Sequence, residues 1–413
     1  MSVEVTRGNA ALSMSIPTMD HTLIDGSFLE GGGQILRNSV SLSALLLKPV
    51  SIHKIRNNRT PPGLKNQHRT GSFLSFKSVT FFKLISQLLF TGLELAATIA
   101  SARLSGARNK SQEIEFIPGR ICLPNNYSAD LITAGSTSLL IQVALPMLLF
   151  SHSPAPASIL TLHGGTNATI LAPQIDYTKY ILLPFIHRHF GVDNISLHIA
   201  QRGYSPKGGG KVVLNATPLC SAQKLQGFSL MDRGKVKRIT GITHFAGLPN
   251  VVAEGIIRGA KRKLAAAGYG CGDKSMSTVD TPDLLTDSGD VSIQISCKRE
   301  PPELTTGAGS GIVLWAELDG GGVIGGSAVG SIGIDPEKTG EQAVDELLRG
   351  LNEAGCVDEV IGTFETLVAE QTLTLLLVAT RPNHHLHGFG RWQVRGSMRN
   401  GWADFTYSVS GNR

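Results

Sequence analysis

The sequence is poor in cysteine, in aromatic residues and in charge. Its 413 residues include only five cysteines, with 6% aromatic and 17% charged residues. The cysteines lie far apart and form no CxxC pair, which argues against a zinc knuckle and a disulfide framework and favours a reducing compartment. The opening MSVEVTRGNAALSMSIPTMDH lacks a charged start followed by an apolar core, so we expect residues 1–21 to be a flexible arm and not a secretory signal.

Long hydrophobic runs are also scarce. The strongest covers residues 71–90, GSFLSFKSVTFFKLISQLLF, but Lys77 and Lys83 interrupt it. A lysine in the middle of a span costs about 3 kcal/mol on insertion scales. A buried helix or a pair of strands is therefore favoured over a membrane span, and we expect no membrane association.

The remaining composition is that of a globular protein. Hydrophobic residues make up 41% of the chain, and its length suits two or three compact units better than one. The net charge of +6 permits an anionic partner such as nucleic acid, but it is small for this length and equally ordinary for other proteins.

Apolar runs rich in β-branched residues alternate with helical patterns along the chain, which predicts an α/β (α+β) fold of repeated βα units with mixed sheets. A basic stretch near residue 233 opens a region with its own strands and an amphipathic helix, and the Gly/Ser-rich residues 320–331 predict an exposed loop or linker. The patterns predict strands at 49–56, 157–165 and 194–203, and helices at 136–150, 177–191 and 341–355, the last with Gly355 as its cap.

Two stretches place charged side chains beside glycines or a predicted turn. GSFLEGGGQILR places Glu30 and Arg37 around three glycines, and IRNNRTPPGLKNQH places Arg56 and Arg59 before a turn that leads to Gln67. Glycines let a backbone approach a ligand closely, and paired guanidinium donors match phosphate oxygens. A tight turn and exposed surface arginines are the alternative interpretations, and the residues alone leave both open.

Two further stretches fit a nucleotide. TAGSTSLLIQ puts small residues at a predicted helix start, where backbone N–H groups favour anions, although a plain cap at Ser136 explains it almost as well. HGGTNATILAPQIDY holds Pro173 and Tyr177, which are suited to hold a flat base between them, although packing is the commoner use of both.

The order of these motifs, together with EIEFIPG and RGYSPKGGG, resembles the RNA 3′-terminal phosphate cyclase family across most of residues 22–359. The intact glycine motif with its acid and arginine resembles the cyclase branch and not the inactive, ribosome-biogenesis branch. The resemblance implies a larger domain of βαβαββ-type repeats at 22–221 and 339–413, its third repeat incomplete, with a smaller α/β domain inserted at 222–338.

The resemblance also implies a mechanism. Such enzymes use ATP and a divalent metal such as Mg²⁺ to adenylylate a histidine, pass AMP to an RNA 3′-phosphate, and let the 2′-hydroxyl close a 2′,3′-cyclic phosphate. It implies a nuclear location, in the nucleoplasm with the cytoplasm as alternative, and RNA 3′-phosphate ends as partners. By position it assigns Glu30 to the metal, phosphate contacts to Arg37, Arg56 and Arg59, a polar site contact to Gln67, and the flanks of the adenine to Pro173 and Tyr177.

The sequence departs from the family pattern in two places. Residues 71–91 are inserted where the pattern continues directly into a helix, either as translated intron or as a lineage-specific loop. After Glu359 neither the expected Asp-Gln pair nor the histidine that takes AMP is visible, and residues 360–413 match nothing in the pattern. His384, His385 and His387 are the available histidines, of which we select His387. A non-catalytic RNA-binding or ribosome-assembly factor on the same scaffold is the alternative. The sequence leaves the oligomeric state open.

Overall fold

The structure is a computed structural model, and it describes most of the chain. The described residues are 21–27, 33–58, 62–64, 76–108, 110–131, 134–151, 155–167, 172–219, 230, 232–270, 291–353, 355–358, 360–361, 395–399 and 402–406. Within these ranges no helix is both long and apolar enough to span a bilayer.

The first unit is a four-stranded sheet with two helices. Strands β1 and β2 are parallel, and β4 pairs antiparallel with both β2 and β3, which gives the order β1-β2-β4-β3. Its elements are β1 (Thr22–Asp25), α1 (Gly33–Leu46), β2 (Val50–His53), α2 (Phe76–Ile99), β3 (Arg103–Ser105) and β4 (Ile114–Ile117).

The second unit repeats this βαβαββ pattern with the same strand order. Strands β5 and β6 are parallel, β8 lies antiparallel between β6 and β7, and the short β11 (Thr305–Thr306) extends the sheet beside β7. Its elements are β5 (Asn126–Asp130), α3 (Thr137–Leu149), β6 (Ser158–Gly164), the consecutive helical segments α4 (Ile175–Tyr177), η1 (Thr178–Leu182) and α5 (Leu183–Phe190), β7 (Ile195–Gly203) and β8 (Gly210–Ala216). The predicted α/β class with repeated units and mixed sheets is confirmed.

The third sheet has a different order, β10-β9-β12-β13, with only β9 and β10 parallel. Its core joins α6 and α7 to one face of the sheet, through residues such as Ile256, Leu314 and Leu347. The proposed domain boundary at residue 338 falls inside α7. The elements are β9 (Val236–Ala246), α6 (Asn250–Ala266), β10 (Ser292–Arg299), η2 (Pro302–Leu304), β12 (Gly309–Leu318), β13 (Val323–Val329) and α7 (Pro336–Asn352).

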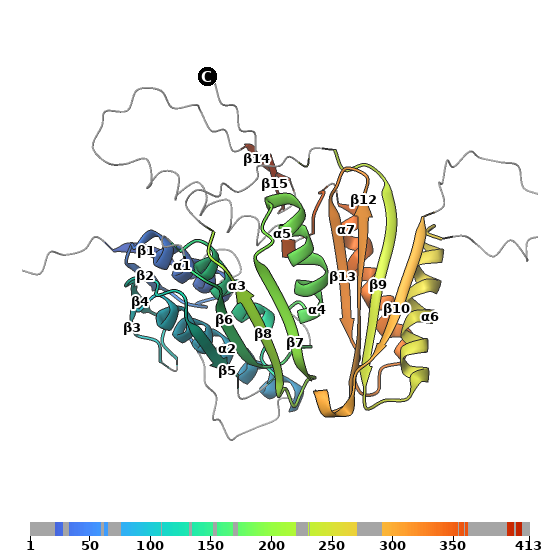
Figure 1. Ribbon diagram of the computed structural model, residues 1–413, viewed down its shortest axis with the longest axis horizontal. Coiled ribbons are helices and arrows are strands. Elements are labelled where there is room, and N and C mark those ends of the chain that lie inside the picture. The colour runs from blue at the N-terminus through green and yellow to red at the C-terminus, as the bar shows by residue number, and fades with distance from the viewer. Residues whose placement is uncertain are drawn as a thin grey trace, which may run out of the picture.

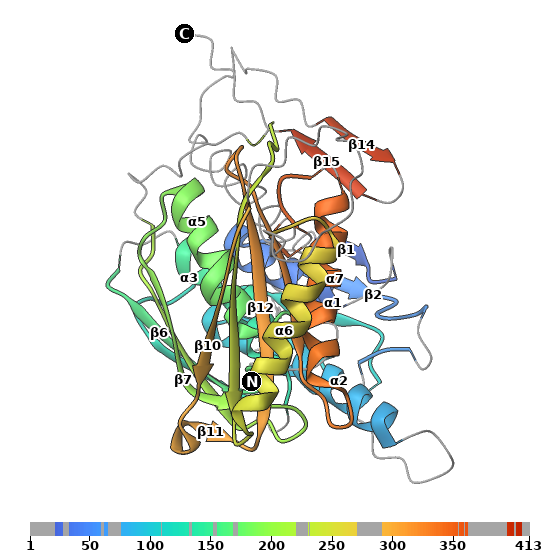
Figure 2. The same cartoon turned by 90° about the vertical axis from the view of Figure 1, so that its right-hand side faces the viewer.

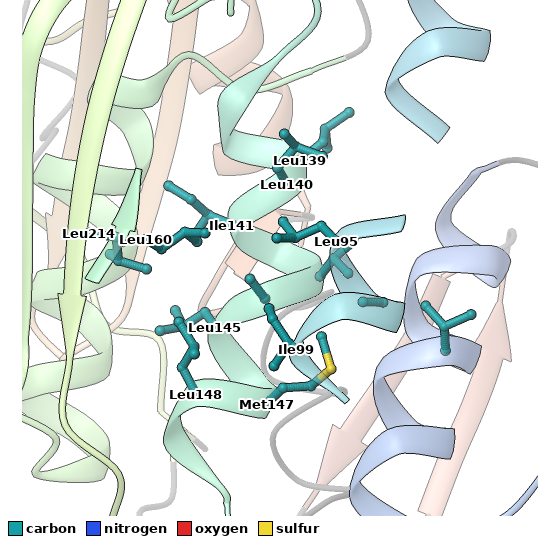
Figure 3. Packing of buried hydrophobic residues seen from close by; sticks show 14 of the residues in the cluster. Leu95, Ile99, Leu139, Leu140, Ile141, Leu145, Met147, Leu148, Leu160 and Leu214 are labelled. Carbon is teal, nitrogen blue, oxygen red and sulfur yellow. The ribbon is translucent and has the colours of Figure 1, made fainter. Parts of the chain in front are cut away.

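The layers stack side by side (Figure 1), with α6 and α7 on the outer face of the third sheet (Figure 2). Helices α1, α2 and α3 pack on one another between the first two sheets. In Figure 3, Leu95 and then Ile99 of α2 follow one another in the same sense as Leu140 and then Met147 of α3, so the two helices run in the same direction.

Most predicted elements appear in the structure, and two differ. Residues 323–329 form the strand β13, four of whose residues are buried, so the loop predicted at 320–331 is wrong. Helix α7 starts at Pro336, five residues before the predicted Glu341, because Asp335 caps it by accepting from the Glu337 N–H at 3.0 Å, and its cap at the other end is Glu353, not Gly355. Residues 76–91 of the inserted tract form one continuous helix, α2, with 92–99, which agrees with the helix alternative for 71–90 and excludes the pair of strands there.

A two-stranded antiparallel hairpin, β14 (Arg395–Arg399) with β15 (Trp402–Thr406), is also described near the carboxyl end of the chain.

Candidate functional site

The carboxyl ends of β1 and β2 form a polar edge. Gly26 donates its N–H to the carbonyl of His53 at 2.7 Å, which holds the two strand ends together. Asp25 accepts from Lys54 Nζ at 2.8 Å and from the Ser27 hydroxyl at 2.6 Å. These hydrogen bonds, first the one from Lys54, hold the pKa of Asp25 well below its usual range. Asp25 is therefore an ionised anchor for the loop that follows β1.

Arg37 lies near the start of α1, at this same edge. A Cβ built on Gly33 would stand 3.0 Å from Arg37 Nη1 and 2.4 Å from Leu89 Cδ2, so only glycine leaves room for both side chains. Burial lowers the pKa of Arg37 to about 10. Its Nε atom is buried and has no hydrogen-bond partner among the described residues. A buried cationic donor of this kind is costly unless an anion meets it, so the position suits a phosphate.

Arg56 follows β2 and reaches the same edge. In a parallel βαβ unit the start of the helix and the residues after the second strand lie at one edge of the sheet, where ligands of α/β proteins bind. Arg56 has a left-handed φ of 54°, which is uncommon outside glycine and asparagine and marks a sharply turned loop. The Asn58 side chain donates to the Ser27 carbonyl at 3.1 Å and joins the two loops. The structure thus places Arg37 and Arg56 at the same edge of the first sheet, and their contact with phosphate stays a prediction.

The start of α3 lies at the same end of the helical layer. Gly33 of α1 faces Leu89 of α2, and Gly92, one turn later on α2, faces Leu140 and Val143 of α3, each at 3.7 Å. Because α2 and α3 run in the same direction, Leu89 is level with the first turn of α3 as well as with the start of α1. The beginnings of α1 and α3 therefore face one region.

Ser136 and Ser138 close the start of α3. Ser136 is the N-cap residue, but its side chain caps no backbone N–H and instead lies 2.6 Å from the Ser138 hydroxyl. Ser138 donates to the carbonyl of Pro173 at 2.6 Å, and Thr137 donates its N–H to Gly165 at 3.0 Å. These bonds fix Pro173 against the helix start, so the partly buried proline borders the region that Arg37 and Arg56 face.

Tyr177 is a buried residue, with 2% of its surface exposed. Its hydroxyl donates to Asp358 Oδ2, and burial raises the pKa of Tyr177 well above its ordinary value, with the Asp358 charge adding to the shift. Asp358 also accepts from the Gly325 N–H at 2.7 Å and the Val360 N–H at 3.0 Å. Tyr177 thus links α4, β13 and the chain after residue 357, and its role beside an adenine stays a prediction.

The remaining predicted site residues, Glu30, Arg59, Gln67 and the three histidines His384, His385 and His387, lie outside the described residues. Among the residues that are described, no group of three His, Cys, Asp or Glu side chains is placed to hold a metal ion.

Sequence reasoning missed a buried polar network between the second and third sheets. Arg202 of β7 forms a bidentate pair with Asp176, with Nη2 to Oδ1 at 2.8 Å, and its Nε donates to Glu300 at 2.9 Å. His244 of β9 lies 2.9 Å from the Tyr204 hydroxyl and 3.0 Å from Gln174 Oε1. Two of the motifs hold its members: RGYSPKGGG contains Arg202 and Tyr204, and HGGTNATILAPQIDY contains Gln174 and Asp176.

The electrostatics of this network are set by Arg202. Burial raises the pKa of Asp176, but the charge that His244 carries when protonated at low pH, together with the permanent charge of Arg202, outweighs burial and holds that pKa well below the usual range. Burial, with the Arg202 charge adding to it, lowers the pKa of His244 to about 4. Asp176 is therefore ionised and His244 neutral at pH 7, and the network is a structural joint with a single charge arrangement.

Fold and site together define an α/β protein of repeated βαβαββ units, with arginines gathered at the carboxyl edge of its first parallel strand pair. The chain belongs to the RNA 3′-terminal phosphate cyclase family, whose model matches residues 28–75 and 86–386. The gap at 76–85 lies inside the inserted tract. The match continues to residue 386, which corrects the expectation that nothing after Glu359 fits the family, and it includes His384 and His385 but ends before His387.

Individual relatives agree with this assignment. A protein of Pyrobaculum neutrophilum named RNA 3′-terminal phosphate cyclase is 35% identical over 335 residues, which cover 81% of each chain. One of the same name from Staphylothermus marinus is 36% identical over 343 residues, covering 82% of this chain and 81% of the relative. A probable RNA 3′-terminal phosphate cyclase of Dictyostelium discoideum is 35% identical over 343 residues, covering 82% of this chain and 67% of the relative.

Proposed function

We propose that the protein is an ATP-dependent RNA 3′-phosphate cyclase, which converts an RNA 3′-phosphate into a 2′,3′-cyclic phosphate. The structural observation that supports this is the buried Arg37 guanidinium, whose Nε meets no acceptor among the described residues at an edge that Arg56 shares. The non-catalytic alternative is not favoured, because the three relatives compared above are all named as cyclases.

In this proposal the arginines hold phosphates through the reaction. Arg37, Arg56 and Arg59 donate to phosphate oxygens and offset the charge that builds up when two phosphates are brought together. A histidine nitrogen, assigned to His387, forms a bond to the α-phosphorus of ATP while the bond to pyrophosphate breaks. The AMP group then passes to an oxygen of the RNA 3′-phosphate, the 2′-hydroxyl attacks that phosphorus, and AMP leaves.

The nucleotide and metal contacts complete the proposal. Pro173, fixed by Ser138, and Tyr177 are assigned to the adenine, and Gln67 is assigned as a polar contact to the nucleotide. Glu30 is assigned to a divalent cation such as Mg²⁺, which supplies charge neutralisation on the polyphosphate when bound.

The test is incubation of the full-length protein with α-labelled ATP and magnesium, followed by a denaturing gel. We expect acid-labile label on the protein, and loss of label on replacing the nucleophile among His384, His385 and His387. A parallel incubation with a 3′-phosphorylated oligonucleotide should yield a phosphatase-resistant end. Folded protein that takes no label and closes no cyclic phosphate would contradict the proposal.

We further propose a nuclear location, in the nucleoplasm with a cytoplasmic pool, because RNA ends of this kind arise during RNA processing. Microscopy of a fluorescent fusion tests it, and exclusion of the fusion from the nucleus would overturn it.

A further inference from the structure

The third sheet has one face that helices only partly cover. Alternate residues of its strands point to opposite faces, and the face that contains Ile239, Leu314 and Ala316 packs against α6 and α7. On the opposite face, the helix of residues 175–190 lies against β13, since Gly325 faces Tyr177 and Ile181. The strands β9 and β10 extend beyond that helix.

The uncovered part is polar and exposed. The register pairs Arg238 with Ser292, Thr240 with Gln294, and Ile242 with Ser296, which places these residues on the same face. Ser292, Gln294, Ser296 and Lys298 of β10 are all exposed, while Thr240 and Ile242 of β9 are half-buried. An open sheet face beside two helices on the other side is the geometry on which single-stranded RNA is bound in several protein classes.

An aromatic pair stands at the border between the helix and this open face. The ring of Tyr180 is parallel to that of Trp315 within 2°, with centroids 6.5 Å apart, and both residues are partly exposed. Tyr180 belongs to η1, a π-helical stretch, and such stretches recur at functional sites because the extra residue per turn redirects side chains. Aromatic faces of this kind stack with RNA bases of any sequence.

Positive charge gathers beside the aromatic pair. Lys179 Nζ lies 5.4 Å from the centroid of the Tyr180 ring. Partial burial lowers the pKa of Lys179, and the charge of Lys298 contributes to the same shift.

The acidic residues of this face are already ion-paired with arginines. Glu317 accepts from Arg238 at 2.7 Å, and Glu300 accepts from Arg202 at 2.9 Å. Lys298 also reaches Glu300, at 3.0 Å, and more than half of the Lys298 side chain is exposed. Lys298 thus completes the compensation of Glu300, whose other partner Arg202 is shared with Asp176. Lys179 forms no ion pair among the described residues, so it adds positive charge to a face whose carboxylates are compensated, which suits a polyanion.

From these observations we propose that the face formed by Tyr180, Trp315, Lys179, Lys298 and the exposed side of β9–β10 binds the single-stranded RNA body upstream of the reacting 3′ end. The inference rests on the proposed function for its substrate class. Tyr180 follows Ile175 by about 8 Å of helix axis, and Ile175 comes just after Pro173, so this face adjoins the proposed nucleotide site. Bases stack on the aromatic pair, and the lysines contact phosphates.

The test is fluorescence anisotropy of 3′-phosphorylated RNA with the full-length protein. We expect Tyr180→Ser to weaken binding of an oligonucleotide of about 12 residues roughly tenfold, with Tyr180→Phe close to wild type, because the ring and not the hydroxyl carries the stacking. Lys298→Ala should lower the slope of log affinity against log salt by about 0.7, the value for one phosphate of a single strand. An oligonucleotide of about three residues, too short to reach the face, should be bound equally by all variants.

Lys261→Ala is the matched control, because Lys261 is exposed on α6, which covers the opposite face of the same sheet. Labelling of the protein by α-labelled ATP should be the same in all four variants. If the proposed enzyme activity is wrong, the wild-type protein takes no label, whereas if the proposed RNA-binding face is wrong, the protein is labelled but the variants bind RNA as the wild type does. If Tyr180→Ser lowers the melting temperature, the exposed Lys298→Ala variant keeps the test decisive. The proposal is overturned if the Lys298→Ala variant binds RNA with the affinity and the salt slope of the wild type. It is also overturned if these substitutions convert a dimer into a monomer, because the face would then bind a second copy of the chain.

Discussion

Replacing Arg202 with methionine keeps most of the side-chain volume and removes the charge that joins the second and third sheets. Arg202 is 1% exposed and Asp176 is fully buried, so the variant leaves the Asp176 carboxylate without its guanidinium partner. Breaking a buried pair in this way costs about 3–5 kcal/mol. We expect a loss of about 4 kcal/mol in the free energy of unfolding, or a melting temperature lower by about 5 °C.

The chain offers a matched control for this prediction. Arg238 pairs with Glu317 at 2.7 and 3.0 Å, but more than half of the Arg238 side chain is exposed. An exposed pair of this kind contributes at most about 1 kcal/mol, so Arg238→Met should change the melting temperature by a few degrees or less.

The assay is calorimetry of the two single variants and of the double variant Arg202→Met/Asp176→Asn. Because the double variant leaves no uncompensated charge at Asp176, it should recover part of the lost stability. Equal melting temperatures for Arg202→Met and Arg238→Met, with no recovery in the double variant, would refute the reasoning that burial makes this pair strong.

Three further predictions follow from buried groups. Folding lowers the pKa of His244 from 6.5 to about 4, so the folded protein binds fewer protons than the unfolded chain. The contribution of neutral His244 to the free energy of unfolding is therefore complete above pH 6.5 and falls by about 3 kcal/mol as the pH drops to 4. Melting temperatures that do not change over this pH range would contradict the prediction. Asp358→Asn should lower the free energy of unfolding by about 2 kcal/mol, because the amide replaces one acceptor oxygen by a donor that faces backbone N–H groups. Tyr177→Phe removes a single hydrogen bond and should cost about 1 kcal/mol. Denaturant titrations measure both, and a larger loss for Tyr177→Phe would count against the role of Asp358. Gly259→Ala should lower the melting temperature although alanine has the better helix propensity, since the new Cβ of α6 would stand 2.1 Å from the Glu337 carbonyl oxygen of α7. A variant more stable than the wild type would show that α6 and α7 can move apart at little cost.

The sequence predicts most of the fold because its signals are local. Residues 158–164 and 195–203 carry the period and composition of strands, and 137–149 that of a buried helix, and each element forms where the pattern indicates. Residues 320–331 mislead because glycine and serine usually mark loops. In the structure Gly326 must lie under α7, where a Cβ would stand 2.4 Å from the Ala343 carbonyl oxygen, so here glycine permits close packing of a helix on a strand.

The candidate site is predictable only in part for the same reason. Arg37 and Arg56 could be brought together from the sequence because one βαβ unit places the start of its helix and the end of its second strand at one edge. The joint around Arg202 could not be predicted, since Asp176, His244 and Glu300 lie far apart in the sequence and no local pattern shows that they meet Arg202. Tyr177 reads as a base-binding aromatic from its neighbours in sequence, yet its hydroxyl contact to Asp358 depends on a residue 181 positions away.

The joint around Arg202 also restricts how the molecule can move. The second and third sheets are joined by the Arg202–Glu300 ion pair, by the hydrogen bonds of His244 to Tyr204 and Gln174, and by the pairing of β11 with β7, so they cannot separate at that seam without exposing these polar groups. A change of conformation that admits substrate must then come from the loops around the site. Crystal structures or solution scattering with and without nucleotide should show the second and third sheets moving as one rigid body.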